Sequence, residues 1–484
     1  MRRVLFGSVI IAGVLSAGGP LTSVAPYETA FTGDTMRVDY LQTGGPGAEA
    51  VALDRVVNDG PWPGSRTSLV DDTNLGKYLF EVIDRGTNRV LFSRGFANLF
   101  GEWETTPDAR AVHRTFSGTL RFPWPRSPVQ VVLKKRDRLN AFHEFWSAII
   151  DPASRQVNRA RLAPAGKVWT LWESGPPETH VDLLLIGDGY PEAQMTKFLA
   201  DARRLVERMF TLEPYRSRRG DFNVRAIAVA EAESGVHNPR TGAMRRTRVG
   251  SEFNVFDSER YALALDNRGW RDVASAAPYD AVQVLINDRY YGGGGIFNDH
   301  AAVAVDSGSA AYIFAHEFGH HFAALGDEYY TSDVAYETGA AELTEPWEPN
   351  VTALHDPAAL KWKDLVEPGT PLPTPWDKAA YEKRSAEIQA ERRRLRASGA
   401  PESAMDALFA TQQAWETTFL SSMAHSGKVG AFEGASYEPK GLYRPETDCI
   451  MFTRDDVGFC RVCRRAISRI IDLHTGKWPV VSSQ

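Results

Sequence analysis

Two histidines and a glutamate in HExxH spacing are the residues of this sequence best suited to chemistry. They are His316, Glu317 and His320, within the run AHEFGHHFAALGDEYY at residues 315–330. On a helix, residues four apart lie nearly above one another, so both imidazoles can bind one metal ion. Glu317 lies one position round the helix, where it can reach a metal-associated water without being a ligand. The spacing predicts a zincin-type site with Glu317 as the general base of peptide hydrolysis.

The third metal ligand has two possible sources. A catalytic zinc ion needs three protein ligands and one open position. In a short route, Gly326 ends the helix and the chain turns, so that Asp327 or its neighbour Glu328 reaches back beneath the metal. In a long route, a later glutamate, Glu342 or Glu345, completes the site. We favour Asp327 because it directly follows the helix-breaking glycine.

The metal-binding helix must be held against a core and supplied with further polar groups. We expect it to begin near Ser309 and to bury its aromatic and aliphatic side chains against a sheet. His321 points away from the metal at helical spacing, which suggests a supporting or packing role. Hydrolysis also needs a hydrogen-bond donor to the developing oxyanion. The candidates are Tyr329, Tyr330, Tyr443 and Arg444, which the sequence does not rank.

Strands alternate with helices in the part of the chain that carries this motif. Apolar runs at 181–186, 222–230 and 281–286 indicate buried strands, and an amphipathic helix is predicted at 191–210. This alternation indicates an α/β (α+β) domain.

A run of four glycines at 292–295 precedes a predicted edge strand at 301–305. The glycines lack the lysine and serine of a phosphate-binding loop. They are better explained as the lip of a substrate cleft, where an extended peptide could add itself as a further strand.

The first third of the chain is predicted to contain strands without alternating helices. From about residue 35 to 146, short strands are separated by turns, a spacing typical of a β-sandwich. We therefore predict two domains: a β-sandwich accessory domain at 26–150 and a metallopeptidase domain at 151–484 with a helical insertion at about 379–415. The sandwich could position substrate, or could serve only to fold and shield the enzyme.

The N-terminus has the pattern of an export signal. Arg2 and Arg3 precede an apolar run at 4–17 that is followed by small residues. We expect a signal peptide at 1–25 and a secreted or periplasmic protein. The alternative is an N-terminal membrane anchor, but the run is short for a span of about 20 residues. The net charge of −6 and the absence of a long basic block make nucleic acid an unsuitable partner.

The three cysteines, Cys449, Cys460 and Cys463, all lie late in the chain. An exported protein permits one disulfide with one thiol left over. The same spacing could belong to an incomplete metal cluster. Because no fourth ligand is evident nearby, the sequence favours packing or a disulfide over a second zinc ion.

The sequence resembles the secreted bacterial IgA-peptidase-like zinc metallopeptidases, a family placed near the metzincins. The resemblance covers nearly the whole chain after the signal peptide. It rests on blocks at 74–82, 93–97, 100–103, 128–132, 185–190, 291–296, 440–445, 448–451 and 459–463, together with the HExxH run. It implies a metzincin-like catalytic domain, Zn²⁺ at His316 and His320, an acidic third ligand, and Glu317 as catalytic acid and base. It also implies that Met451 forms the methionine turn beneath the metal.

One position departs from the metzincin pattern. That pattern places the third ligand six residues after the second histidine, where this chain has Gly326, so Asp327 and Glu328 both stay open. The leading hypothesis is a secreted zinc endopeptidase acting on protein or peptide substrates. The alternatives are a surface binding protein that keeps the fold, which would not need Glu317, and a zinc amidohydrolase of cell-wall peptides or glycopeptides.

Overall fold

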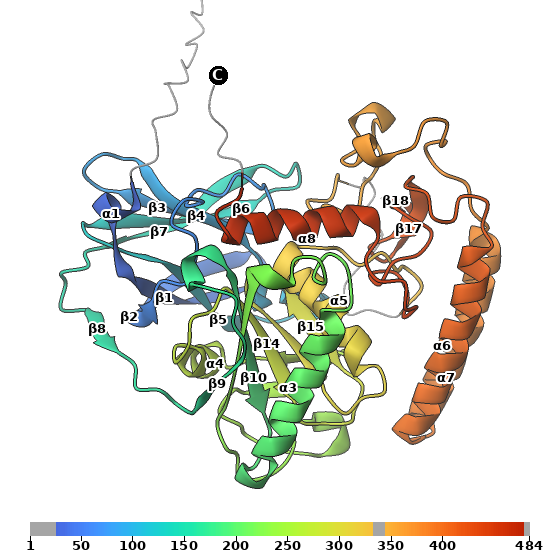
Figure 1. Ribbon diagram of the computed structural model, residues 1–484, viewed down its shortest axis with the longest axis horizontal. Helices are drawn as coiled ribbons and strands as arrows, with labels where there is room; N and C mark the ends of the chain where they lie inside the picture. Colours follow the sequence, from blue (N-terminus) through green and yellow to red (C-terminus); the bar gives the residue numbers. More distant parts are fainter. Residues whose placement is uncertain (1–25, 333–343, 479–484) are drawn as a thin grey trace, which may run out of the picture.

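The computed structural model describes residues 26–332 and 344–478. The predicted signal peptide at 1–25 and the candidate ligand Glu342 lie outside the described residues. The described chain forms a β-rich N-terminal domain and a second domain in which helices cover a sheet, with a pair of long helices at one side (Figure 1). None of the helices in these ranges has the length and apolar character needed to cross a membrane.

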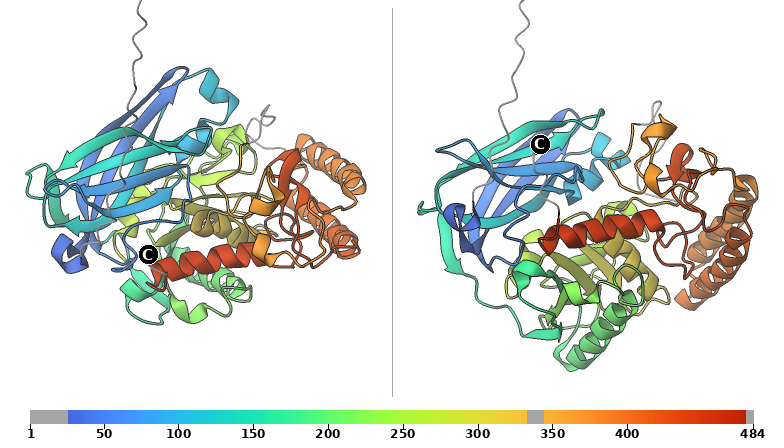
Figure 2. Two further views of the ribbon diagram at one scale, coloured as in Figure 1. Left: turned by 90° about the horizontal axis from the view of Figure 1, so that it is seen from above. Right: turned by 45° about the horizontal axis from the view of Figure 1, so that its top comes forward.

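The N-terminal domain consists of two four-stranded sheets that face each other across one core (Figure 2). Apolar side chains alternate along the strands, so Val38 and Phe122 of one sheet meet Phe80 and Val131 of the other. The first sheet has the order β5-β1-β2-β8 and the second β4-β3-β6-β7. The elements are α1 (Tyr27–Ala30), β1 (Phe31–Gly45), β2 (Ala48–Pro61), β3 (Tyr78–Asp84), β4 (Val90–Phe96), α2 (Leu99–Trp103), β5 (Arg114–Pro125), β6 (Val129–Arg136) and β7 (Phe142–Ile150), followed by β8 (Val157–Arg161).

Strand β8 lies beyond the boundary predicted at residue 150. It pairs in parallel with β2, through Val157 opposite Val56. Of its five residues only Val157 is buried, and the other four are exposed. With one buried side chain the strand has no hydrophobic pattern, which is why the sequence indicates only a polar connector there.

The second domain is built on a six-stranded sheet with the order β15-β16-β14-β10-β11-β9. The four central strands are parallel, and the two outer strands are antiparallel to their neighbours. Its strands are β9 (Val168–Trp172), β10 (Val181–Asp188), β11 (Phe222–Ala228), β14 (Ala281–Ile286), β15 (Gly293–Ile296) and β16 (His300–Ala304), and a small pair β12 (Ser251–Phe253) and β13 (Ala262–Ala264) lies beside it.

Helices cover both faces of this sheet. Along β10, Leu183 and Leu185 contact one core and Leu184 and Ile186 contact the other, because successive side chains of a strand point to opposite faces. Helices α3 (Met195–Met209), α5 (Ala310–Ala323) and α8 (Arg461–His474) contribute to the first core. Helix α4 (Asn267–Ala274) contributes to the second.

The edge of the sheet differs from the sequence-based expectation. The strand predicted at the edge, at 301–305, corresponds to β16, which lies between β14 and β15. The edge strand is β15, formed by the glycine-rich run itself. Glycines have low strand propensity, so the pattern concealed this strand. They are needed because a Cβ at Gly295 would collide with the Glu317 carbonyl oxygen, and one at Gly293 would collide with Ile313.

The helical insertion predicted at about 379–415 corresponds to two antiparallel helices at one side of the molecule (Figures 1 and 2). They are α6 (Lys378–Ala397) and α7 (Glu402–Ser421), and they are followed by the hairpin of β17 (Phe432–Ala435) and β18 (Glu438–Arg444). Tyr381 of α6 stacks on Trp415 of α7. The hairpin returns the chain to the neighbourhood of α5.

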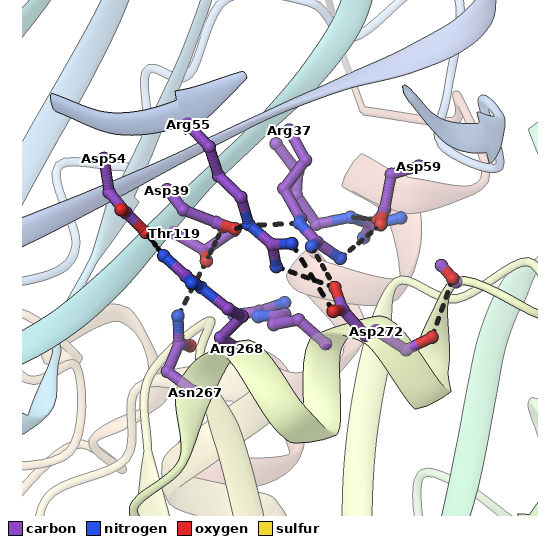
Figure 3. A network of polar contacts seen from close by, with 12 residues as sticks. Arg37, Asp39, Asp54, Arg55, Asp59, Thr119, Asn267, Arg268 and Asp272 are labelled. Carbon is purple, nitrogen blue, oxygen red and sulfur yellow. Dashed lines mark hydrogen bonds and ion pairs between the residues drawn. The ribbon is translucent and has the colours of Figure 1, made fainter. Parts of the chain in front are cut away.

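A buried ion-pair network joins the two domains (Figure 3). Arg37 of β1 is fully buried, lies 2.7 Å from Asp59 and pairs with Asp272 of helix α4. Arg55 of β2 bridges Asp272 and Asp39, each at 2.7 Å. Both arginines, the buried Arg37 and the partly exposed Arg55, therefore have carboxylate partners, which offset the desolvation of their charges. The network fixes the orientation of the sandwich relative to the second domain.

Candidate metal centre

Helix α5 carries the HExxH residues and begins where the sequence predicts, with Ser309 at its N-cap. Its end differs. The helix stops at Ala323, and Ala324 adopts a left-handed conformation with φ of 55°. The Ala324 amide donates to the His320 carbonyl at 3.1 Å, which closes the helix end in the manner of an αL motif. Alanine rarely adopts this conformation, so the sequence suggested Gly326 instead.

Gly326 instead allows a later part of the chain to pack closely against it. Its amide donates to the Asn350 side chain at 2.7 Å, and its carbonyl accepts from the same side chain at 2.9 Å. A Cβ at Gly326 would approach Val351 and Glu348 to within 3.2 Å. The glycine therefore lets a later segment lie close against the chain just before Asp327.

Side-chain atoms of His316, His320 and Asp327 meet between helix α5 and the segment that follows it. Asp327 Oδ1 lies 3.0 Å from His316 Nε2 and 3.2 Å from His320 Nε2, and the two nitrogens are 3.1 Å apart. In a tetrahedral site, bonds of about 2.0 Å separate the donor atoms by about 3.3 Å. The triangle therefore has the dimensions of three protein ligands of one zinc ion with a fourth position open.

Hydrogen bonds orient both imidazoles. His316 Nδ1 lies 2.9 Å from the Ile450 carbonyl, and His320 Nδ1 lies 2.5 Å from the Leu325 carbonyl. A carbonyl oxygen only accepts, so each Nδ1 carries the proton and each Nε2 presents a lone pair. Asp327 Oδ1 is buried and accepts no hydrogen bond. Three electron-rich atoms thus converge about 3 Å apart, an arrangement that a divalent cation neutralises.

The ionisable groups of the centre shift one another's pKa values. Burial lowers the pKa of His320, but the Asp327 carboxylate overrides burial and raises it to about 9. Burial favours the neutral form of Asp327, yet the two imidazoles hold its pKa well below the usual range. A metal ion bound between these groups would take the place of the extra proton on His320, because only the deprotonated imidazole nitrogen is a ligand.

Glu317 lies beside the triangle. Its carboxylate oxygen and the ligand atoms of the two histidines are all within 4.8 Å of one another. Burial raises the pKa of Glu317, and the neighbouring imidazoles oppose this shift. A carboxylate with a raised pKa is suited to accept a proton and return it.

A cleft of about 500 Å³ opens over these groups. Its walls come from both domains: Lys77, Arg136 and Asn140 of the sandwich face Gly293 and Gly295 of the edge strand β15. The volume is within the range of substrate pockets. The sandwich therefore lines the cleft as well as supporting the second domain.

The other candidate ligands lie elsewhere. Glu328 is fully buried, and its Oε1 accepts from Asn350 at 3.0 Å and lies 3.3 Å from Cys463 Sγ. Glu345 pairs with Lys361 at 3.0 Å and accepts from the Ala353 amide. Of the described acidic candidates, only Asp327 meets both histidines.

Of the four candidate oxyanion donors, only Tyr329 lines the cleft. Tyr329 lines the cleft and accepts a 2.8 Å hydrogen bond from Arg260, which leaves its own hydroxyl proton available. Arg444 is fully buried and lies over Trp376 and Phe452. Tyr330 and Tyr443 are likewise absent from the residues that line the cleft.

His321 is turned away from the centre, as helical spacing predicts. Its Nδ1 lies 3.0 Å from the Ile296 carbonyl, and its Nε2 accepts from the Val282 amide at 3.0 Å. Burial lowers its pKa to about 3, so the ring is neutral. His321 ties the metal helix to strands β14 and β15.

Met451 lies beneath the metal helix. It is fully buried, and a Cβ at Gly319 would lie 3.1 Å from its sulfur atom. The Met451 carbonyl accepts from the Glu328 amide at 2.9 Å. The segment at 449–451 therefore contacts both α5 and the segment that carries Asp327.

Sequence reasoning missed Tyr437. Its hydroxyl donates to Asp327 Oδ2, and the Ser436 amide donates to the Asp327 carbonyl at 2.9 Å. Both Ser436 and Tyr437 have positive φ angles, of 47° and 66°. Residues with side chains rarely adopt this conformation, which is often retained at functional sites. No motif surrounds Tyr437, so only the fold reveals its contact with the metal centre.

Two protein-family models match this chain. A family model described as IgA Peptidase M64 matches residues 169–471, well over half of the chain. A second model, described as Peptidase M64 N-terminus, matches residues 26–147. No curated protein matches the chain significantly.

Proposed function

The chain belongs to the IgA Peptidase M64 family of metallopeptidases, and from this premise we propose that it is a secreted zinc-dependent endopeptidase. The observation that supports this most directly is the triangle of His316, His320 and Asp327 beside Glu317, at the floor of an open cleft. Two imidazoles, one carboxylate and an open fourth position are a typical donor set of catalytic zinc.

Each group has a distinct part in the proposed reaction. Zinc bound at this triangle would polarise the scissile carbonyl and acidify a water molecule. Glu317 receives the proton of the attacking water and returns it to the nitrogen of the leaving amine. Tyr329, held by Arg260, is placed to donate a hydrogen bond to the oxyanion.

The substrate has a natural place along the edge of the sheet. Strand β15 is the edge strand, and its glycines line the cleft. We propose that an extended peptide lies along β15 and contacts the sandwich on the opposite wall, so that the scissile bond reaches the metal centre. The proposed metzincin-like arrangement is supported by Met451, which lies below α5 at Gly319.

Cleavage of end-blocked peptides tests the proposal. Wild-type protein loaded with zinc should cut internal bonds of acetylated, amidated peptides, and chelation should abolish the activity. Glu317→Gln should keep its zinc and lose about 10²–10⁴-fold in rate, the usual contribution of a general base. Unchanged cleavage by Glu317→Gln would refute its role. If the protein cleaves only cell-wall peptides, it is an amidohydrolase and the proposed endopeptidase function is wrong.

A further inference from the structure

A second group of potential metal ligands lies below the metal centre. It consists of the three cysteines, Cys449, Cys460 and Cys463, together with Glu328. The four ligand atoms all lie within 4.8 Å of one another, and all four residues are buried. Glu328 is a fourth potential ligand, which the sequence did not connect with the cysteines because it precedes them by more than a hundred positions.

The separations have the dimensions of a four-coordinate metal site. Cys449 Sγ and Cys463 Sγ are 3.9 Å apart. Glu328 Oε1 lies 3.3 Å from Cys463 Sγ and 3.9 Å from Cys460 Sγ. Tetrahedral zinc with bonds of about 2.3 Å to sulfur and about 2.0 Å to oxygen separates two sulfur atoms by about 3.8 Å and sulfur from oxygen by about 3.5 Å.

Backbone amides stabilise the thiolate forms of Cys449 and Cys460. The Met451 and Cys460 amides point at Cys449 Sγ at 3.5 and 3.3 Å, and the Cys463 amide points at Cys460 Sγ at 3.4 Å. Cys460 is also the N-cap of the 14-residue helix α8. Amide donors and a helix N-terminus stabilise the deprotonated sulfur that binds metals.

A disulfide explains the group less well. A disulfide bond is about 2.05 Å long, far below the 3.9 Å between Cys449 and Cys463. It would also leave the third thiol, and Glu328 Oε1 at 3.3 Å from Cys463 Sγ, without a metal ion. One oxygen of that carboxylate, Oε2, is buried and accepts no hydrogen bond. Burial of an ionised carboxylate is costly, and a metal ion bound to it would offset that cost together with the charge of Arg444.

We propose that Cys449, Cys460, Cys463 and Glu328 bind a second, structural zinc ion. Thiolates select zinc over magnesium or calcium, and four protein ligands leave no position open for water or substrate. The site would therefore stabilise the fold and take no direct part in hydrolysis.

The ion would hold together the segments that support the catalytic centre. Glu328 directly follows Asp327, and Ile450, whose carbonyl accepts from His316, directly follows Cys449. Cys460 and Cys463 belong to the start of α8, which covers the sheet beside α5. One ion would join the segment of Glu328 to the two cysteine segments, which follow it by more than a hundred residues.

X-ray absorption at the zinc edge of the purified full-length protein tests the site. We expect two zinc ions per chain and sulfur neighbours at about 2.3 Å, together with lighter nitrogen or oxygen neighbours. A spectrum without sulfur would overturn the proposal, as would an intact mass two hydrogens below the reduced value, which would mark a disulfide.

The double variant His316→Ala/His320→Ala separates this proposal from the proposed catalytic site. It should keep one zinc ion with mainly sulfur neighbours. If it binds no zinc although it folds, the thiolate site does not exist. If instead it keeps two ions, the thiolate site stands and the assignment of the histidines fails.

A pair of matched carboxylate variants tests the fourth ligand without removing a thiol. Glu328→Gln should weaken retention of the sulfur-bound zinc against a chelator by at least 10-fold. Asp448→Asn alters a carboxylate beside Cys449 that accepts from Thr453, and it should retain zinc as the wild type does. Equal retention by the two variants would remove Glu328 from the site.

Discussion

The backbone amide of Glu328 donates a 2.9 Å hydrogen bond to the carbonyl oxygen of Met451. On one side of this contact, Asp327 turns its carboxylate to the two histidines. On the other side, Glu328 turns its carboxylate to the cysteines. Neighbouring acidic residues thus serve two different clusters, and their roles can be separated by mutation.

Asp327→Asn should weaken zinc binding at the histidine site by more than about 100-fold, because loss of a ligand exceeds the 10–100-fold effect of removing a supporting group. Competition with a chelator measures this. Glu345→Gln is the matched control, since Glu345 pairs with Lys361 away from the centre. Equal losses in the two variants would contradict the assignment of Asp327.

Tyr437→Phe should lower zinc affinity by about 10-fold, because Asp327 loses the hydroxyl that orients its second oxygen. Thermal unfolding with saturating zinc should change little. Tyr443→Phe alters the same hairpin outside the cleft and should bind zinc normally. A Tyr437→Phe variant with wild-type affinity would show that Asp327 is held by its backbone alone.

Gly295→Ala should lower the free energy of unfolding by about 1–3 kcal/mol, because the new methyl group collides with the Glu317 carbonyl. Peptide cleavage should fall as well, since strand β15 must move away from α5. Gly220→Ala has open space around the added methyl and is the control. Denaturant unfolding compares the two, and equal stability would refute the close approach of β15 to the helix.

Asp272→Asn should destabilise the protein by about 2 kcal/mol, because fully buried Arg37 loses one of its carboxylate partners. Asp54→Asn removes a pair with the half-exposed Arg268 and should cost less than about 1 kcal/mol. Denaturant unfolding measures both differences. Equal effects would mean that the interdomain network contributes no more than a surface pair.

The effect of Asp272→Asn should depend on pH in a defined direction. Burial would raise the pKa of Asp272, but hydrogen bonds from Arg55 and Arg37 outweigh it and lower the folded-state value. The carboxylate therefore adds stability above its unfolded pKa of about 3.9, and this contribution disappears as pH falls below that value. The difference between wild type and variant should shrink below about pH 4. A constant difference would exclude the ion pair as its cause.

Much of the fold could be predicted from local patterns of apolar residues. Short strands separated by turns predicted the β-sandwich, and a continuous apolar run predicted β10. Helical spacing placed His316 and His320 on one face of α5. Such features depend only on residues that are close together in the sequence. The misplaced features lacked a local signal: β8 buries a single side chain, β15 is almost all glycine, and α5 ends at an alanine.

The sequence by itself determined which helix could carry metal chemistry, because HExxH spacing sets two imidazoles and a carboxylate by helix geometry alone. Only the tertiary structure showed that Asp327, and not Glu328, lies beside the two histidines, because this placement depends on Asn350, Tyr437 and Met451, which contact this segment from far along the chain. The same long-range contacts brought Glu328 to the cysteines. Convergence of distant segments leaves no periodic pattern in the sequence, so it becomes visible only when the chain is folded.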